Sequence, residues 1–194
     1  MNTVNFTRME DSTREEYEFL GDLEKKYCSG LADRLLKALK QLEYSLSGYK
    51  VTRLEHVLQG ATRAHRAGES DEMILAVLLH DIGDELAPHS HSEMAAAVLR
   101  PFVSKKIYWI VKHHGLFQMF YYAHFFGGDR NIRDQFKQHQ WYQDAVDFCH
   151  KYDQNCFDPN YDSEPVEFFE PLVRKMLANP AIVDAEHVAR YGSA

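Results

Sequence analysis

The chain has 194 residues, 45% of them hydrophobic and 26% charged, so its size and composition fit one compact domain and exclude intrinsic disorder. Its 22 basic and 29 acidic residues give a formal net charge of -7, which argues against nucleic acid and anionic membrane surfaces as partners. No apolar stretch approaches the roughly 20 residues that are needed to span a bilayer. The oligomeric state stays open.

Helical patterns recur along the chain while alternating strand patterns are scarce, which predicts an all-α domain. The segment 74–79 is apolar on every side and is therefore expected to form a buried central helix. Helices are expected at residues 15–27, 31–46, 53–67, 71–81, 93–99, 105–112, 132–140, 141–152 and 165–177. Three Ser or Thr residues precede a Glu by three positions, the spacing of a capping box: Thr13 with Glu16, Thr52 with Glu55 and Ser90 with Glu93.

No linker or shift in composition divides the chain, so we expect one helical domain over residues 1–194. Within it we expect N-terminal helices in 13–46, a metal-binding core in 49–158 and C-terminal helices in 164–190.

Three cysteines form neither an even set nor a CxxC pair, which argues against a disulfide framework and a thiolate zinc site. They are Cys28, Cys149 and Cys156; Cys149 lies on an apolar helix face and is expected to be a buried structural thiol. The first eleven residues do not resemble a secretory signal. A cytoplasmic protein is expected.

The placement of the histidines is more informative than their number, which is eleven. His80 and Asp81 are adjacent at the end of the most apolar predicted helix. His56 lies on an earlier helix beside the apolar Leu54 and Leu58. Such a His and Asp can bind one metal ion together, or the carboxylate can bridge two ions.

Further candidate ligands, His91, His114 and Asp153, follow on later elements. Four imidazoles and two carboxylates suit a dinuclear site, because six protein ligands on one ion would leave no position for a substrate. Within the adjacent histidines, His89 is the alternative to His91 and His113 is the alternative to His114.

Several short motifs together resemble the HD-domain family, whose signature is H…HD…D with two further histidines in its dinuclear members. They are LEHVLQ at 54–59, LLHDIG at 78–83, HSE at 91–93, HHGLF at 113–117 and FCHKYD at 148–153. The first two are similar to the mixed-valence diiron oxygenase branch, which includes myo-inositol oxygenase and enzymes that cleave hydroxyphosphonates. The resemblance covers residues 49–158 and implies an HD-domain fold, a helical bundle around a dinuclear metal site.

The resemblance also implies a cofactor and roles for individual residues. The cofactor would be a pair of iron ions in the mixed-valence Fe(II)/Fe(III) state, with dioxygen as cosubstrate. One iron would be held by His56, His80, Asp81 and Asp153, and the other by Asp81, His91 and His114. Asp81, His91 and His114 are also the candidate catalytic residues. Gln59, one turn after His56, would orient a ligand or a bound water.

The sequence departs from these relatives at the expected substrate contacts. Asp84 follows the HDIG run and Tyr49 precedes the first ligand, at positions where the relatives have other residues. An acidic Asp84 near aromatic side chains favours a trimethylammonium group. A phosphonate needs positive partners, of which Arg63 is the first candidate; Gln118 completes the candidate substrate-binding set. The alternative for these residues is that they carry ordinary surface charge or pack in the core, without a role in substrate binding.

The implied enzyme is a non-heme diiron oxygenase that cleaves the carbon–phosphorus bond of a 1-hydroxyphosphonate. The expected substrate is (R)-1-hydroxy-2-(trimethylammonio)ethylphosphonate, and the expected products are glycine betaine and phosphate. The alternatives are a metal-dependent phosphohydrolase acting on a small phosphate ester and an oxygenase of an inositol-type polyol, because the ligands alone fit all three reactions. A non-catalytic binding module would not need a complete ligand set.

Overall fold

A computed structural model describes residues 2–180, which form eight α-helices and four short 3-10 helices and contain no strand. The all-α prediction is confirmed. The α-helices are α1 (Arg14–Ser29), α2 (Leu31–Gln41), α3 (Arg53–Arg66), α4 (Asp71–Leu79), α5 (His91–Leu99), α6 (Lys105–Tyr122), α7 (Tyr142–Tyr152) and α8 (Val166–Leu177). The 3-10 helices are η1 (Met9–Asp11), η2 (Leu42–Tyr44), η3 (Ala123–Phe126) and η4 (Ile132–Phe136).

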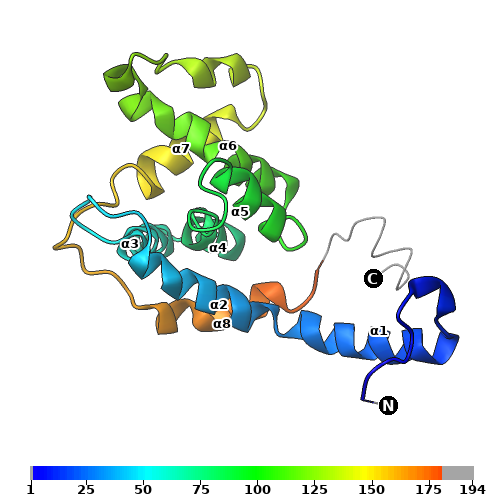
Figure 1. Ribbon diagram of the computed structural model, residues 1–194. Coiled ribbons are helices and arrows are strands. Elements are labelled where there is room, and N and C mark those ends of the chain that lie inside the picture. The colour runs from blue at the N-terminus through cyan, green and yellow to red at the C-terminus, as the bar shows by residue number, and fades with distance from the viewer. Residues whose placement is uncertain (1, 181–194) are drawn as a thin grey trace.

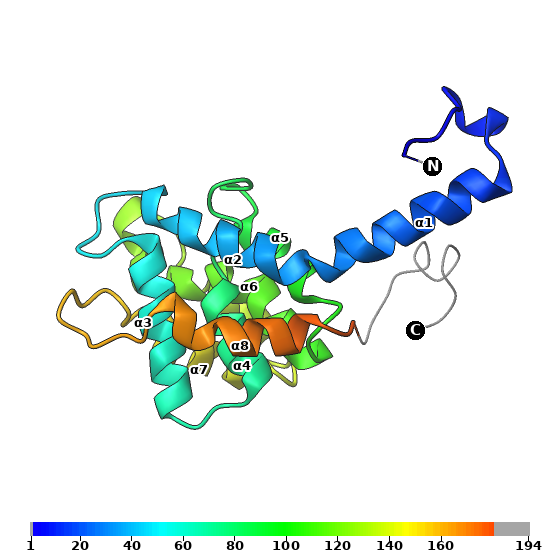
Figure 2. The ribbon, with the colours of Figure 1, turned by 90° about the horizontal axis from the view of Figure 1, so that it is seen from below.

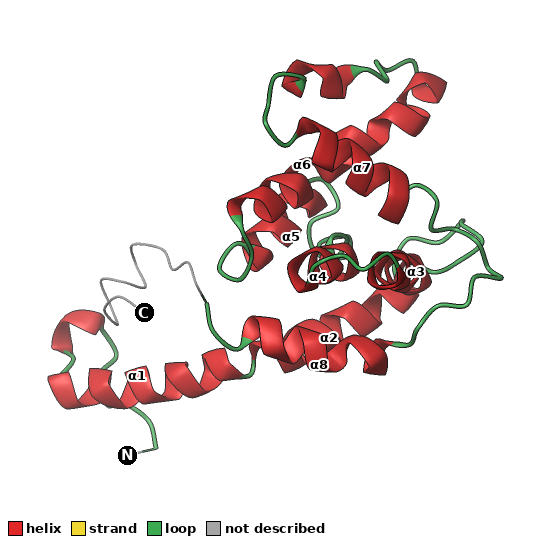
Figure 3. Ribbon diagram, turned by 180° about the vertical axis from the view of Figure 1, so that it is seen from behind, coloured by secondary structure: helices red, strands yellow, loops and turns green. Residues whose placement is uncertain are grey.

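The helices lie in three layers (Figure 1), with α2 beside α8, α3 beside α4, and α5, α6 and α7 grouped on the far side. The view from behind shows the same order (Figure 3). Helix α4 contacts α3, α6 and α8, and every residue from Met73 to Leu79 is buried. The expected central helix is therefore confirmed. Helix α1 projects away from these layers (Figure 2).

Two of the three expected capping boxes are present. Thr13 and Thr52 each accept a hydrogen bond from the backbone of the Glu three residues later, and each Glu side chain bonds back to the cap. The prediction for Ser90 is wrong, because its side chain makes no cap hydrogen bond and its backbone has φ -151° and ψ 33°. Ser90 still occupies the N-cap position, so α5 begins at His91, two residues before the expected start, and this histidine lies in the first turn of the helix.

Helix ends differ from the predictions where contacts outside the segment decide them. Helix α2 ends at Gln41 and tightens into η2, so it is shorter than expected. Helix α6 runs through the expected end at 112 to Tyr122, and the segment 132–140 forms only the short η4. The expected C-terminal helices in 164–190 correspond to α8 as far as Leu177, and residues 181–194 lie outside the described residues.

The three cysteines differ in their exposure to solvent. Cys149 and Cys156 are buried, Cys28 is exposed, and all three thiols are free. Within residues 2–180, none of the helices is both long and apolar enough to cross a membrane.

Candidate metal centre

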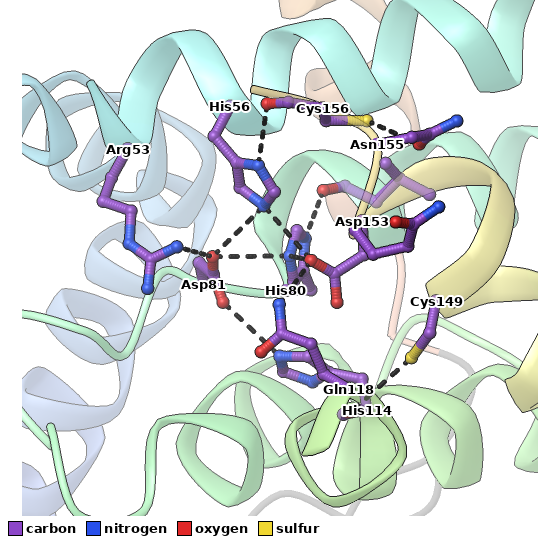
Figure 4. Close-up of polar contacts among 12 residues, drawn as sticks. Arg53, His56, His80, Asp81, His114, Gln118, Cys149, Asp153, Asn155 and Cys156 are labelled. Carbon is purple, nitrogen blue, oxygen red and sulfur yellow. Dashed lines mark hydrogen bonds and ion pairs between the residues drawn. The ribbon is translucent and has the colours of Figure 1, made fainter. Parts of the chain in front are cut away.

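Four buried side chains from α3 and from the C-terminal ends of α4 and α7 converge on one point. His56 lies within α3, His80 caps the C-terminus of α4, Asp81 follows it, and Asp153 caps the C-terminus of α7. The His56 Nε2 atom lies 3.6 Å from Asp81 Oδ2 and 3.4 Å from Asp153 Oδ1. The His80 Nε2 atom lies 3.4 Å from Asp81 Oδ2. Figure 4 shows both rings facing the same two carboxylates.

A second group uses the other oxygen of the same aspartate. His114 Nε2 lies 3.4 Å and His91 Nε2 lies 3.7 Å from Asp81 Oδ1, and the two Nε2 atoms are 3.2 Å apart. His114 comes from the middle of α6 and is buried, whereas His91 at the start of α5 is partly exposed. The two oxygens of Asp81 therefore face two different histidine groups, as a carboxylate that bridges two ions would.

The protonation of three of the rings follows from their hydrogen bonds. The Nδ1 atoms of His56, His80 and His114 lie 3.0, 2.7 and 2.7 Å from the backbone carbonyl oxygens of Cys156, Val77 and Val111. Because a carbonyl oxygen only accepts, each Nδ1 carries a proton and donates it. This leaves the lone pair of each neutral ring on Nε2, the atom that faces the carboxylates, as in metal-bound histidines.

The donor atoms fit a metal ion better than they fit one another. The buried atoms His56 Nε2, His80 Nε2, Asp81 Oδ2 and Asp153 Oδ2 have no hydrogen-bond partner. Buried acceptors that face each other without a shared proton are costly, and a cation between them removes that cost. The ligand atoms of His56, His80 and Asp81 lie within 4.8 Å of one another, as do those of Asp81, His91 and His114. Both groups can therefore hold a metal ion.

Burial and the carboxylates act in opposite directions on the pKa values of the centre. Burial lowers the pKa of His80 to about 4, so this ring stays neutral and ready to ligate. Burial also acts to lower the pKa of His56 and of His114, but the adjacent carboxylates prevail and raise both. Burial acts to raise the pKa of Asp81, yet the surrounding histidines and Arg53 hold it well below its usual value.

The neighbouring histidines that were the alternatives lie elsewhere. The Nδ1 atom of His113 donates to the carbonyl oxygen of Trp109 at 2.8 Å, and its ring packs against the Trp109 ring. His89 is exposed in the turn before α5. The structure thus brings His91 and His114, rather than these two, to the carboxylates.

Arg53 is a residue of the centre that the sequence analysis missed. It is the first residue of α3, one turn before His56, and only 13% of its side chain is exposed. Its Nη1 lies 3.5 Å from Asp81 Oδ2, and its Nε lies 3.0 Å from Asp84 Oδ2. The guanidinium therefore compensates the charge of both carboxylates; Figure 4 shows its contact with Asp81. The sequence did hold a signal for this role: Arg53 precedes His56 by three residues, which places both on the same face of the helix.

Asp84, predicted to contact the substrate, lies at the edge of this centre and is half-buried. Burial and then the charge of Asp81 raise the pKa of Asp84 to about 6, against the opposing effect of Arg53. Its Oδ1 lies 3.9 Å from His91 Nδ1. Asp84 is thus close to the candidate ligands, but its charge is already partnered by Arg53.

Two glutamines hold the Asp153 end of the centre. Gln118 Nε2 donates to Asp153 Oδ1 at 2.6 Å, so the predicted substrate contact fixes the orientation of a candidate ligand. Gln59 is buried and bonds the backbone of Asp158 at both ends of its amide, at 2.8 and 3.3 Å. Gln59 therefore fixes the loop that follows Asp153 and contacts no candidate ligand directly in these bonds.

The remaining predicted substrate contacts lie farther out. Tyr49 is 52% exposed and stacks on Phe157, whose ring stacks on His56. The guanidinium of Arg63 lies 4.1 Å from the centre of the Tyr161 ring. Tyr49 thus reaches His56 through one intervening ring, and the Arg53 guanidinium lies 5.2 Å from the centre of the Tyr49 ring. A substrate-binding role for Arg63 stays a prediction.

Comparison with known proteins gives two similarities. The model of the HD domain matches residues 53–145. A 1-hydroxy-2-(trimethylamino)ethylphosphonate dioxygenase (glycine-betaine-forming) from Leisingera caerulea is 38% identical over 78 residues. This similarity covers 34% of the chain and 40% of the relative, so the chain matches less than half of the length of that protein.

Proposed function

We propose, from the match of the HD-domain family model to residues 53–145, that the metal centre is a dinuclear iron site of an oxygenase. The proposed reaction is the dioxygen-dependent cleavage of the carbon–phosphorus bond of a 1-hydroxyphosphonate. The observation that carries the proposal is the division of the Asp81 carboxylate between two histidine groups, with oxygens 3.4–3.7 Å from the facing nitrogens. The similarity to a phosphonate dioxygenase supports the choice of reaction.

The residues of the chain would divide the work as follows. His56, His80 and Asp153 would hold one iron, His91 and His114 the other, and Asp81 would bridge them. The bound irons would supply the redox chemistry that joins dioxygen to the substrate carbon. Five of these six side chains are buried, which excludes water from the centre. His91, which is partly exposed, is the exception.

We further propose 1-hydroxy-2-(trimethylammonio)ethylphosphonate as the substrate, the compound class in the name of the relative. With one dioxygen it gives glycine betaine, phosphate and one proton, so both oxygen atoms are accounted for in the two products. The carbon that carries the hydroxyl is oxidised to the carboxylate and dioxygen is reduced. A small-molecule substrate in the cytoplasm, with neither nucleic acid nor membrane as a partner, remains a prediction from the composition.

The test is phosphate release by the iron-loaded protein from a panel of 1-hydroxyphosphonates, in air and under strict anaerobiosis. Release that requires oxygen is expected, and the best substrate of the panel identifies the 2-substituent. Release without oxygen would instead assign the centre to hydrolysis of phosphate compounds. No release from any member would refute the phosphonate assignment and make inositol-type polyols the next panel.

A matched pair of variants connects the activity to the centre. His114→Ala removes a candidate ligand, while His113→Ala removes the adjacent ring that packs on Trp109. We expect the first to lose iron and activity and the second to keep both. Equal losses in the two variants would refute the assignment of His114.

A further inference from the structure

Two arginines contact the same aromatic ring at the end of α6. The guanidinium carbon of Arg133, on η4, lies 3.7 Å from the centre of the Phe120 ring, and that of Arg130 lies 4.3 Å from it. Two carboxylates adjoin the pair in sequence: Asp134 binds Lys137 at 2.8 Å and the Tyr142 hydroxyl at 2.8 Å, and Asp129 accepts a hydrogen bond from the backbone N–H of Asn131 at 2.8 Å. Two positive charges therefore lie at Phe120, while the carboxylates next to them in the sequence have other partners.

Arg133 is nine-tenths buried, with 9% of its surface exposed. Its Nε and Nη1 have no hydrogen-bond partner, and neither has the buried Nε of Arg130. A guanidinium is always charged, and burying its donors without acceptors is costly. Such a group in a folded protein calls for a ligand or another functional reason. An oxyanion would satisfy several of these donors at once, because the planar guanidinium matches a phosphate or phosphonate with two parallel hydrogen bonds.

The arginine pair is linked to the metal centre through α6 and α7. Phe120 and Tyr121 follow Gln118 on α6, and Gln118 holds Asp153. The Tyr121 hydroxyl lies 3.4 Å from Nδ1 of His150, which is three residues before Asp153 on α7. Burial raises the pKa of Tyr121, while Arg133, which its side chain contacts, acts against this rise. The pair thus lies beside the parts of α6 and α7 that carry Gln118 and His150.

We propose that Arg130 and Arg133 form a binding site for a tetrahedral oxyanion, with Tyr121 and His150 at its edge. In the proposed function this site takes the phosphonate group of the substrate and so determines the preference for phosphonates over neutral polyols. The assignment to the substrate rests on the proposed function, whereas the anion site itself does not. Arg63, the candidate from the sequence, packs instead on Tyr161.

Inorganic phosphate binding to the iron-loaded protein, measured by titration calorimetry without turnover, tests the site. The variants are Arg133→Ala, Arg130→Ala and Arg133→Lys. The matched control is Arg34→Ala, which removes an arginine that lies 3.9 Å from the centre of the Tyr27 ring on another face of the chain. Iron content and the melting temperature are recorded for every variant, which separates binding from folding and metal loading.

We expect phosphate affinity to fall at least tenfold in both Ala variants at unchanged iron content, and to stay unchanged in Arg34→Ala. Arg133→Lys should restore part of the affinity, because an ammonium keeps the charge but lacks the planar fork. Should Arg133→Ala fail to fold, the more exposed Arg130 and the Lys variant still report on the site. Unchanged phosphate affinity in these variants, or no phosphate binding by the wild type, would overturn the proposal. Arginine-dependent phosphate binding combined with oxygen-independent phosphate release would refute the oxygenase and keep the anion site.

Discussion

Replacing Gly83 with alanine should separate the two halves of the metal centre. Gly83 lies in the turn after Asp81, against the first residue of α5. A Cβ atom at this position would lie 2.7 Å from the carbonyl oxygen of His91 and 2.9 Å from its Cα. Ordinary van der Waals contact begins at 3.4 Å. The backbone of His91 must therefore retreat by about 0.7 Å, at a cost of roughly 1–3 kcal/mol for an overpacked site.

A displacement of this size is large for a metal ligand, because ligand distances in proteins are held to about 0.2 Å. His91 is one of only three residues in its group, whereas the group around His56 has four. We therefore expect the affinity for the ion at His91 to fall at least 10–100-fold, the usual scale even for the loss of an outer-sphere partner. The ion in the other group should remain.

The assay is iron content per chain after dialysis against a graded series of chelator concentrations, together with the melting temperature. Gly83→Ala should release one iron at a chelator concentration at which the wild type keeps two. The control is Gly30→Ala, where the new Cβ would lie 3.1 Å from Nη1 of the flexible Arg34 side chain. Two irons held with wild-type affinity in Gly83→Ala would refute the reasoning. So would the joint loss of both irons at an unchanged melting temperature.

Three further predictions concern charge, the loop after α7 and the thiols. Asp84→Ala should raise the KM for a trimethylammonium substrate more than the KM for its neutral analogue, because it leaves the Arg53 guanidinium unpaired beside the cation. Arg53→Ala should lower the KM for the trimethylammonium substrate relative to the neutral analogue, because it leaves Asp84 unpaired; equal effects on both KM values would contradict cation recognition. Gln59→Ala should lower the free energy of unfolding in urea by about 1–3 kcal/mol through two lost buried hydrogen bonds, and an unchanged value would show that the loop does not depend on them. Burial raises the pKa of Cys149, and that of Cys156 to about 12. The folded chain therefore keeps protons that the unfolded chain loses above about pH 9, and stability should fall by about 1.4 kcal/mol per pH unit for each buried thiol. At pH 8, iodoacetamide should modify only the exposed cysteine, as mass spectrometry of the peptides would show.

Local patterns predicted most of the helices, because periodicity and caps act within a few residues. The all-round apolar segment of α4 is the clearest case, since only a buried central helix tolerates it. The end of α6 was missed for a non-local reason. Gly115, three residues past the expected end, lies inside α6, where a Cβ would lie 2.7 Å from Ser92 Oγ on α5. The glycine allows α5 and α6 to approach each other closely. The residues of α6 taken alone do not indicate such a contact.

The candidate ligands were accessible from the sequence because a resemblance to a family names positions directly. The contacts of the residues that support these ligands were not accessible from the sequence. The amide of Gln59 bonds a backbone 99 residues away, and Arg53 pairs with two carboxylates in the turn that follows α4. Contacts of this kind depend on how helices pack rather than on any motif, so only the structure assigns them.

Arg53 also changes how the charge of the centre should be understood. From the sequence, Asp84 was an uncompensated carboxylate available to a cationic substrate. In the structure, Arg53 lies between Asp84 and Asp81, so any cation at Asp84 competes with the guanidinium. Two metal ions at the centre would themselves neutralise Asp81 and weaken its hold on Arg53. Arg53 would then pair with Asp84 alone. Binding of the substrate cation would depend more on aromatic faces such as Tyr49 than on a free carboxylate. Recognition of the substrate would thus rest mainly on its anionic end, where Arg130 and Arg133 have unpartnered donors.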